Sequence, residues 1–150
     1  MLRRLGIAVL VGVVVQATTL AAAALPTNSE AMAALLRDAI AERDYGAIEA
    51  VINWDGAGKI KRRVVAFSVR RGLGRTVKSI TVEPTDGQAI AATAKLNNKR
   101  LNMPVSHKIR VVYDEPPING VVPTAVYLVG GDEAGWRIAL VVRTGGHHGD

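Results

Sequence analysis

Apolar residues in the first half of the chain recur every three or four positions, which is the spacing of one helix face. The pattern predicts a helix over residues 29–43, preceded by polar capping residues, and a second short helix that ends near Trp54. A third helix is predicted over 58–71, after a glycine-rich break. The apolar positions of this third helix form one stripe, made of Ile60, Val64 and Phe67.

Beyond residue 75 the apolar period shortens to two and β-branched residues become common, which indicates strands. The strands are expected over 76–83, 88–96, 105–114, 121–129 and 136–143. The alanines of the segment 88–96 fit a helix as well, and residues 97–104 are expected to form a loop. The last two strands should pair as a hairpin across residues 130–135. About three helices followed by about five mainly antiparallel strands predict an α+β fold, with the helices packed on a curved sheet.

Two segments carry a resemblance to a known superfamily. Residues 35–48 read LLRDAIAERDYGAI, and residues 135–138 read GWRI. They resemble the opening and closing signatures of the nuclear-transport-factor-like superfamily of cystatin-like α+β cones, in which a helix runs into a charged or glycine turn, a short helix follows, and a Trp-x-Ile pattern marks the final strand. The resemblance implies a conical cavity between the helices and the concave sheet. Because that superfamily includes isomerases, dehydratases, hydrolases and non-catalytic domains, it does not decide the function.

The N-terminus has the features of an export signal. Arg3 and Arg4 precede an uncharged apolar run over 5–15, and four alanines close the segment at Ala24. The alternative is an uncleaved anchor, but a helix over that run is only about 16 Å long, against about 30 Å for a hydrocarbon core. We therefore expect a signal peptide cleaved after Ala24, and a periplasmic or secreted protein without a stable membrane span after cleavage. One α+β domain is expected over 25–143, with a disordered tail over 144–150.

The length and composition of the chain set the size of the domain and exclude some kinds of site. The chain has 150 residues, of which about 126 remain after cleavage, and a single hydrophobic core can stabilise a domain of that size. It has no cysteine, which excludes a thiolate nucleophile and a cysteine zinc site. His147 and His148 are adjacent on a glycine-flanked tail and lack the spacing that presents two ligands on one helix face. No metal and no cofactor are expected.

Charge is segregated along the chain. The net charge is −4 over 25–55, +11 over 56–113 and −3 over 114–150. Residues 56–82 contain eight cations and no acid. One interpretation is a solvated helix face that the acidic N-terminal helices partly neutralise. The other is an electropositive surface for an anionic partner, whose candidate residues on the third helix are Lys59, Arg62, Arg63 and Arg70.

Four residues are candidates for a pocket or a catalytic group. His107 and Tyr113 share one face of a predicted strand but lie about 20 Å apart along it. His107 suits a general base near neutral pH and could be oriented by an aspartate such as Asp55. A strand-end or surface position explains this histidine as well. Trp54 lies beside a glycine-rich break and is a candidate for the mouth of a cavity, although core packing also explains it.

The sequence therefore supports two hypotheses. The first is an exported, non-catalytic domain that binds a protein, an anionic component of the cell envelope or a small ligand, with the third-helix cations as a contact surface. Nucleic acid is not an expected partner, because the cationic stretch offers only Phe67 for base stacking. The second is a lyase, isomerase or hydrolase that acts on a small molecule in a cone cavity. Whether a cavity exists, and which polar groups line it, discriminates between them.

Overall fold

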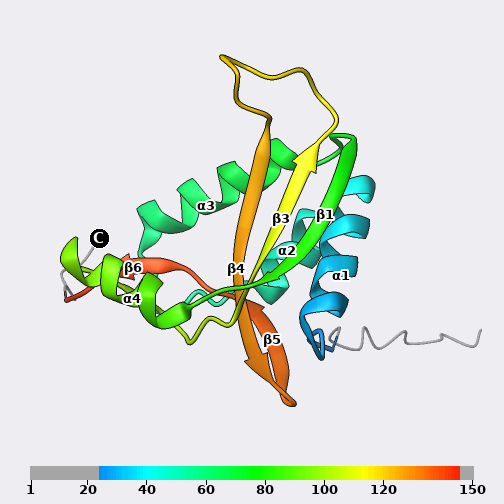
Figure 1. The fold of residues 1–150 in the computed structure, drawn as a ribbon. Helices are drawn as coiled ribbons and strands as arrows, with labels where there is room; N and C mark the ends of the chain where they lie inside the picture. The colour runs from blue at the N-terminus through cyan, green and yellow to red at the C-terminus, as the bar shows by residue number, and fades with distance from the viewer. Residues whose placement is uncertain (1–23, 146–150) are drawn as a thin grey trace, which may run out of the picture.

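The computed structural model describes residues 24–145, which form four helices and six strands (Figure 1). The helices are α1 (Ser29–Glu42), α2 (Tyr45–Val51), α3 (Lys59–Gly72) and α4 (Gly87–Leu96). The strands are β1 (Val77–Pro84), β2 (Lys99–Leu101), β3 (His107–Tyr113), β4 (Thr124–Asp132), β5 (Gly135–Ile138) and β6 (Val141–Arg143). The predicted α+β class is confirmed.

Local sequence explains where the first two helices begin. The side-chain oxygen of Asn28 accepts a hydrogen bond from the Ala31 amide at 2.8 Å, and that of Asp44 accepts one from the Ala47 amide at 3.0 Å. These bonds satisfy amides that the first turn of a helix leaves without a main-chain partner. Arg43 ends α1 in the left-handed conformation, with φ 59, and turns the chain directly into α2.

The main sheet has four antiparallel strands in the order β1-β3-β4-β5. In β3, Ile109, Val111 and Tyr113 are buried on one face, whereas the residues between them are partly exposed, as the alternation predicts. The core lies between this face and the helices α1 and α2. Its fully buried side chains are Met32, Leu36, Ile40, Ile48, Ile109, Val111 and Val129. β1 and β5 are the edges of the sheet, so the sheet is open.

Residues 88–96 lie in α4, so the predicted strand there is wrong. The Asp86 carboxylate caps the helix, accepting hydrogen bonds from the Gln88 and Ala89 amides at 3.0 and 3.1 Å. The Thr93 hydroxyl donates to the Ala89 carbonyl at 3.0 Å, one turn earlier. Alanine is the best helix former, and together with the aspartate cap it outweighs the short alternation of apolar residues.

The predicted loop over 97–104 and the predicted strand over 136–143 also need correction. The loop region contains β2, which pairs antiparallel with β6 in a separate two-stranded sheet. The last predicted strand is interrupted between β5 and β6, because β5 pairs with β4 and β6 pairs with β2. At the interruption the Leu140 amide donates to the side-chain oxygen of Asn102 at 2.8 Å instead of to a neighbouring strand.

The predicted ends of the chain are only partly within the described residues. Of the expected signal peptide only Ala24 is described, and of the expected tail only Thr144 and Gly145. The Thr144 amide donates to the Asn98 carbonyl at 3.0 Å. Over residues 24–145 there is no helix with both the length and the apolar character to cross a membrane.

Candidate functional site

α3 exposes its apolar stripe. Ile60, Val64 and Phe67 are 76%, 54% and 63% exposed, although an amphipathic helix normally turns such a stripe toward the core. Its only buried residues are Val69 and Gly72. Gly72 lies so close to the Tyr113 hydroxyl that a Cβ atom there would overlap it, so the C-terminal end of α3 packs on Tyr113 of β3. The stripe therefore lies on the surface of the described chain.

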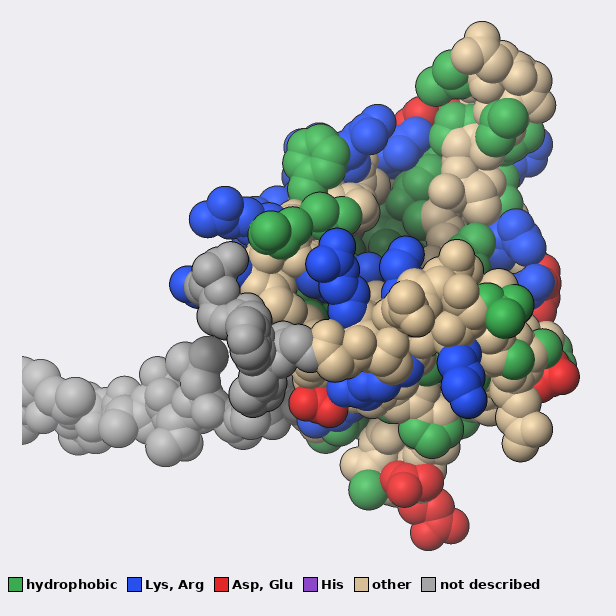
Figure 2. Space-filling model, turned by 90° about the vertical axis from the view of Figure 1, so that its left-hand side faces the viewer, with side chains coloured by type: hydrophobic (Ala, Val, Ile, Leu, Met, Phe, Trp, Pro, Cys, Tyr) green, Lys and Arg blue, Asp and Glu red, His purple; other side chains and the backbone are tan. Residues whose placement is uncertain are grey.

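A cleft of about 670 Å³ lies between α3, β4 and the connection from β3 to β4. Val69 and Gly72 of α3 line it on one side, and Ala125, Val126 and Tyr127 of β4 line it on the other. Arg71 and Arg75 supply its cationic groups. Figure 2 shows the hollow on this face, with hydrophobic side chains around it and Lys and Arg side chains at several points of its margin. We name this the α3 cleft.

The connection between β3 and β4 protrudes from the top of the molecule in Figure 1 and ends in a tight turn. Ile118 and Val121 exchange two main-chain hydrogen bonds, of 2.9 and 3.0 Å. Asn119 and Gly120 between them have φ 52 and 78, the geometry of a type I′ turn, for which Asn-Gly is the preferred pair. We name residues 116–123 the finger. Its turn holds two apolar side chains, Ile118 and Val121, 67% and 68% exposed.

Four arginines lie over aromatic rings. The guanidinium carbons of Arg62, Arg70, Arg71 and Arg75 are 5.2, 4.1, 5.7 and 4.1 Å from the ring centroids of Trp54, Tyr45, Phe67 and Tyr113. Such contacts orient a cation without neutralising it. Within the described part of the chain, none of the cations of α3 forms an ion pair with a carboxylate. The charge of α3 is therefore available to an anionic partner.

Arg75, by contrast, is paired at the edge of the α3 cleft. Its Nε and Nη2 atoms donate to the two carboxylate oxygens of Glu115 at 2.7 and 2.5 Å. The hydrogen bonds from Arg75 lower the pKa of the Glu115 carboxyl, and the bonds to Glu115 raise the pKa of Arg75. Arg71 is consequently the cation of the cleft that has no carboxylate partner among the described residues.

We expect Arg75→Gln to raise the pKa of the Glu115 carboxyl toward its usual value. In the native protein, the stabilisation from a carboxyl with a lowered pKa is complete above the unfolded pKa of about 4.3 and is lost as the pH falls through the lower folded value. The difference in melting temperature between the native protein and the variant should therefore shrink below about pH 4. NMR titration of the Glu115 side chain measures the pKa directly. A pKa that does not move in the variant would contradict the pair, and Lys78→Gln serves as the control.

The floor of the α3 cleft is uncharged at neutral pH. Burial raises the pKa of the hydroxyls of Tyr113 and Tyr127, the two tyrosines that line it. Both hydroxyls therefore remain protonated and can donate hydrogen bonds. The cleft thus combines apolar walls, neutral donors and a nearby cation.

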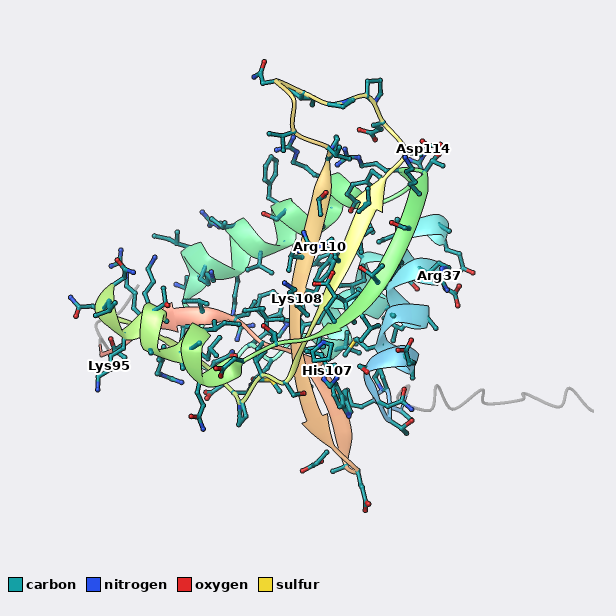
Figure 3. All side chains as sticks on the ribbon, in the orientation of Figure 1. Arg37, Lys95, His107, Lys108, Arg110 and Asp114 are labelled. Carbon is teal, nitrogen blue, oxygen red and sulfur yellow. The ribbon has the colours of Figure 1, made fainter. Side chains whose placement is uncertain are left out.

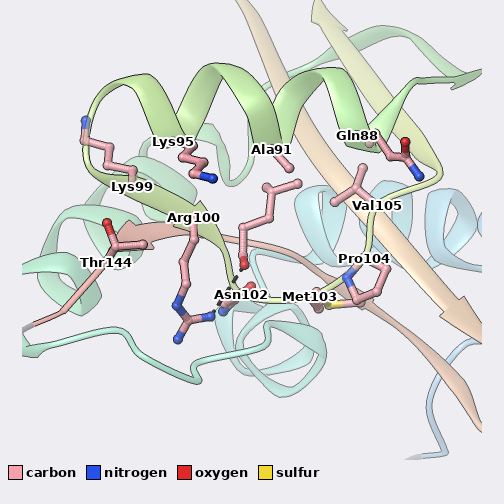
Figure 4. Close-up of a pocket in the computed structure, with 12 residues that line it drawn as sticks. Gln88, Ala91, Lys95, Lys99, Arg100, Asn102, Met103, Pro104, Val105 and Thr144 are labelled. Atoms are coloured by element: carbon pink, nitrogen blue, oxygen red, sulfur yellow. Dashed lines mark hydrogen bonds between the residues drawn. The ribbon is translucent and has the colours of Figure 1, made fainter.

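A second cleft, of about 690 Å³, lies between α4 and β2 (Figure 4). Lys95 from α4 and Lys99 and Arg100 from β2 line it, and its lining includes no acidic residue. The Arg100 guanidinium donates to the Leu101 carbonyl at 3.5 Å and lies close to Gly56. We name this the α4 cleft. α4 lies on the same side of the molecule as α3 (Figure 1), and the lining of this cleft is cationic.

The candidate catalytic residues lie at separate places. His107 is at the start of β3, where its ring lies 5.5 Å from the Trp136 ring and Nδ1 is 2.9 Å from the Ser106 hydroxyl (Figure 3). Tyr113 is at the opposite end of β3, in the α3 cleft. Asp55 lies in the loop before α3, where its carbonyl accepts a hydrogen bond from Asn102. Neither His107 nor Asp55 lines either of the two clefts.

The structure brings two of the candidate surface residues, Trp54 and Arg62, into contact. Arg62 lies over Trp54 and also donates to the Ala57 carbonyl at 3.0 Å, and the Trp54 Nε1 atom donates to the Glu49 carbonyl at 3.3 Å. The Trp54 ring is partly buried against the core. Lys59, Arg63 and Arg70 lie on the exposed side of α3. Trp54 thus supports the helix that carries the cations.

Most residues of the α3 cleft were not predicted from the sequence. Ala125 and Tyr127 occupy alternate positions of β4, and a period of two could have placed them on one face. The Asn-Gly pair at 119–120 was a recognisable signal for the finger turn. Nothing in the local sequence indicated that α3 would leave an open cleft between itself and β4.

Comparisons with protein-family models, with curated proteins and with solved structures give no match. Among residues 24–145, no three His, Cys, Asp or Glu side chains form a group that could hold a metal ion. The function proposed below therefore rests on the geometry of the α3 face, by which we mean the surface formed by α3, the α3 cleft and the finger.

Proposed function

We propose that the chain is a non-catalytic binding domain, and that its α3 cleft takes the apolar part of a ligand or partner whose acidic group lies near the α3 cations. The observation that carries this proposal is an apolar cleft, open to solvent, beside cations without a carboxylate partner among the described residues. Ligand sites commonly combine apolar walls with a few polar groups that orient the ligand.

Export is part of the proposal. The apolar run and the alanines near the N-terminus support a periplasmic or secreted location. The contacts of Leu25 with the core and of the Pro26 carbonyl with the Trp136 amide, at 2.7 Å, fit a folded domain that begins after Ala24. The resemblance to the nuclear-transport-factor-like cones supports a ligand between helix and sheet, which is where the α3 cleft lies.

Catalysis receives less support from the geometry. General acid–base chemistry needs a titratable group within hydrogen-bond reach of the bound substrate. Of the candidate residues Asp55, His107 and Tyr113, only Tyr113 lines one of the two clefts, and burial raises the pKa of its hydroxyl away from neutrality. A neutral phenol in this position suits hydrogen bonding to a ligand.

The test uses dodecanoate as a probe, because it has one carboxylate and one apolar chain. Isothermal titration calorimetry should detect binding to the native protein, and Ala125→Arg should weaken it at least about tenfold, since the new side chain fills and charges the cleft. The control is Ala91→Arg, the same change in the α4 cleft. Equal affinity in the native protein and in Ala125→Arg would reject the α3 cleft as the site.

The contribution of the α3 cations is tested on the same probe. Changing Lys59, Arg62, Arg63 and Arg70 together to glutamine should weaken binding and reduce its dependence on salt, whereas Arg71 in the cleft keeps its charge. Because Arg62 and Arg70 also lie on aromatic rings, the double change Lys59→Gln with Arg63→Gln separates loss of charge from loss of those contacts. An affinity and a salt dependence that the quadruple change leaves unaltered would reject these four cations as a contact surface.

A further inference from the structure

One face of the molecule combines an outward apolar helix stripe, an apolar finger and cations with no carboxylate partner among the described residues (Figure 2). We propose that this face docks on an anionic lipid bilayer, with α3 lying along the surface and the finger inserted in the interfacial layer. This inference rests on the proposed function, because both assign binding to the α3 face. It goes further by naming an anionic bilayer as the partner of that face.

The first support is the geometry of α3. At about 100° per residue, Ile60, Val64 and Phe67 fall within about 60° of one another, on the side opposite the buried Val69. Cations lie within about 100° of the stripe on both sides, with Lys59, Arg63 and Arg70 on one side and Lys61 on the other. Arg71 falls within the stripe itself, where its guanidinium lies over the Phe67 ring. An apolar stripe bordered by long cationic side chains is typical of helices that lie in a membrane interface, where the charged ends reach the headgroups.

The second support is the finger. It presents Ile118, Val121 and Val122, which are 67%, 68% and 43% exposed, on the same side of the sheet as the α3 cleft. The two main-chain hydrogen bonds of its turn hold it in one conformation, and proline at 116 and 117 restricts the backbone that leads to it. A preformed turn loses little conformational entropy when it inserts its side chains into a partner.

The third support is charge, which also favours a bilayer over a second copy of this chain. Residues 56–113 carry a net +11, which includes Lys95, Lys99 and Arg100 of the α4 cleft. Two copies joined through this face would bring like charges together. Each Lys or Arg near an anionic leaflet contributes attraction instead. A bilayer also accepts apolar side chains from separate elements without a matching groove.

The experiment uses the chain from Leu25 onward, because the buried residues of the described chain, from Pro26 to Val142, all lie within it and the apolar run over 5–15 would itself bind lipid. Sedimentation with vesicles compares phosphatidylcholine alone with a mixture that contains phosphatidylglycerol. We expect binding to the anionic vesicles only, weakened by salt. Val64→Ser together with Phe67→Ser should lower the partition coefficient at least about tenfold. An unchanged partition coefficient would overturn the proposal.

Insertion is measured by a fluorescent label. Because the chain has no cysteine, Val64→Cys provides a single attachment site for an environment-sensitive dye, and Ala134→Cys provides the control at the turn between β4 and β5. We expect anionic vesicles to shift the emission to the blue at position 64 and not at position 134. If poly-glutamate binds as tightly as the vesicles and the dye at position 64 remains in water, the partner is an acidic polymer and the bilayer is rejected. A native dimer that Val64→Ser with Phe67→Ser dissociates would also reject it.

Failure of this inference is distinguishable from failure of the proposed function. Val64 and Phe67 do not line the α3 cleft, so their replacement should leave dodecanoate binding unchanged. Ala125→Arg should weaken dodecanoate binding at least about tenfold and retain vesicle binding. If instead both variants lose both activities with their melting temperatures unchanged, the α3 cleft and the α3 stripe are one site, and independent docking on a bilayer is rejected.

Discussion

Asn102→Leu should lower the free energy of unfolding by about 4 kcal/mol, because several buried main-chain groups lose their hydrogen-bond partner and each such loss costs about 1–3 kcal/mol. The Asn102 amide nitrogen donates to the carbonyls of Asn53 and Asp55 at 2.6 and 3.0 Å, and its side-chain oxygen accepts from the Leu140 amide at 2.8 Å. Asn102 is only 9% exposed. It therefore joins the loop before α3 to the break between β5 and β6.

Urea denaturation measures this loss, and two further variants separate its causes. Asn102→Asp keeps the shape but its carboxylate cannot donate to two carbonyls. Burial next to those carbonyls raises the pKa of the new carboxyl in the folded protein. The Asn102→Asp variant should therefore be most stable at pH values below the pKa that this carboxyl has in the unfolded chain, and its free energy of unfolding should fall as the pH rises above that value. Asn97→Ala removes an exposed amide bonded to the Thr93 carbonyl and should cost about 0.5 kcal/mol. A cost of about 1 kcal/mol or less for Asn102→Leu would contradict the bridging role.

Gly87→Ala and Gly130→Ala should each destabilise the protein by about 3 kcal/mol, because the added methyl group has no space. A Cβ atom at Gly87 would overlap the Val105 carbonyl oxygen, and one at Gly130 would overlap the Pro104 carbonyl oxygen. Both obstacles are main chain, which cannot rotate away as a flexible side chain can. The segment over 104–105 therefore passes between α4 and β4 only because both elements have glycine at the crossing.

The matched control is Gly46→Ala in α2, where the nearest atom to the added Cβ is the Asp44 carboxylate oxygen at an ordinary 3.4 Å. Alanine in a helix is favoured over glycine by about 0.8–1 kcal/mol, so this variant should be more stable than the native protein. Thermal melting of the three variants gives the comparison. If the change in melting temperature has the same sign in all three variants, the close approach of residues 104–105 to Gly87 and Gly130 is not the cause of the destabilisation.

The first three helices were predictable because their signals are local. Asn28 and Asp44 cap α1 and α2, and apolar residues recur at helical spacing in each. The strand over 105–114 was predictable for the same reason, since alternation is also local. β6 was not, because the break after Ile138 depends on Asn102, a residue distant in sequence. The sequence of α4 fits both the helical period and the strand period, and the cap formed by Asp86 favours the helix.

The candidate site was less predictable than the fold. Periodicity shows that Ile60, Val64 and Phe67 share a face of α3, but not whether that face meets the sheet or the solvent. The direction in which that face points depends on tertiary packing, in which Val69 and Gly72 of α3 are buried and Gly72 lies against Tyr113. The pairing of Arg75 with Glu115 joins residues 40 positions apart and likewise has no local signal. The excess of cations was visible in the sequence, because composition does not depend on packing.

The separation of charge along the chain becomes a separation in space. The exposed acids Glu30, Asp38 and Glu42 lie on α1, on the opposite side of Figure 1 from the cations of α3. The charge of residues 24–145 is consequently distributed asymmetrically, with an excess of cations on the side of α3. The field of an anionic surface exerts a torque on such an asymmetric charge distribution before contact, at separations up to a Debye length of about 8 Å in physiological salt. Diffusing molecules are then turned with α3 foremost, so that a larger fraction of encounters is productive at low ionic strength.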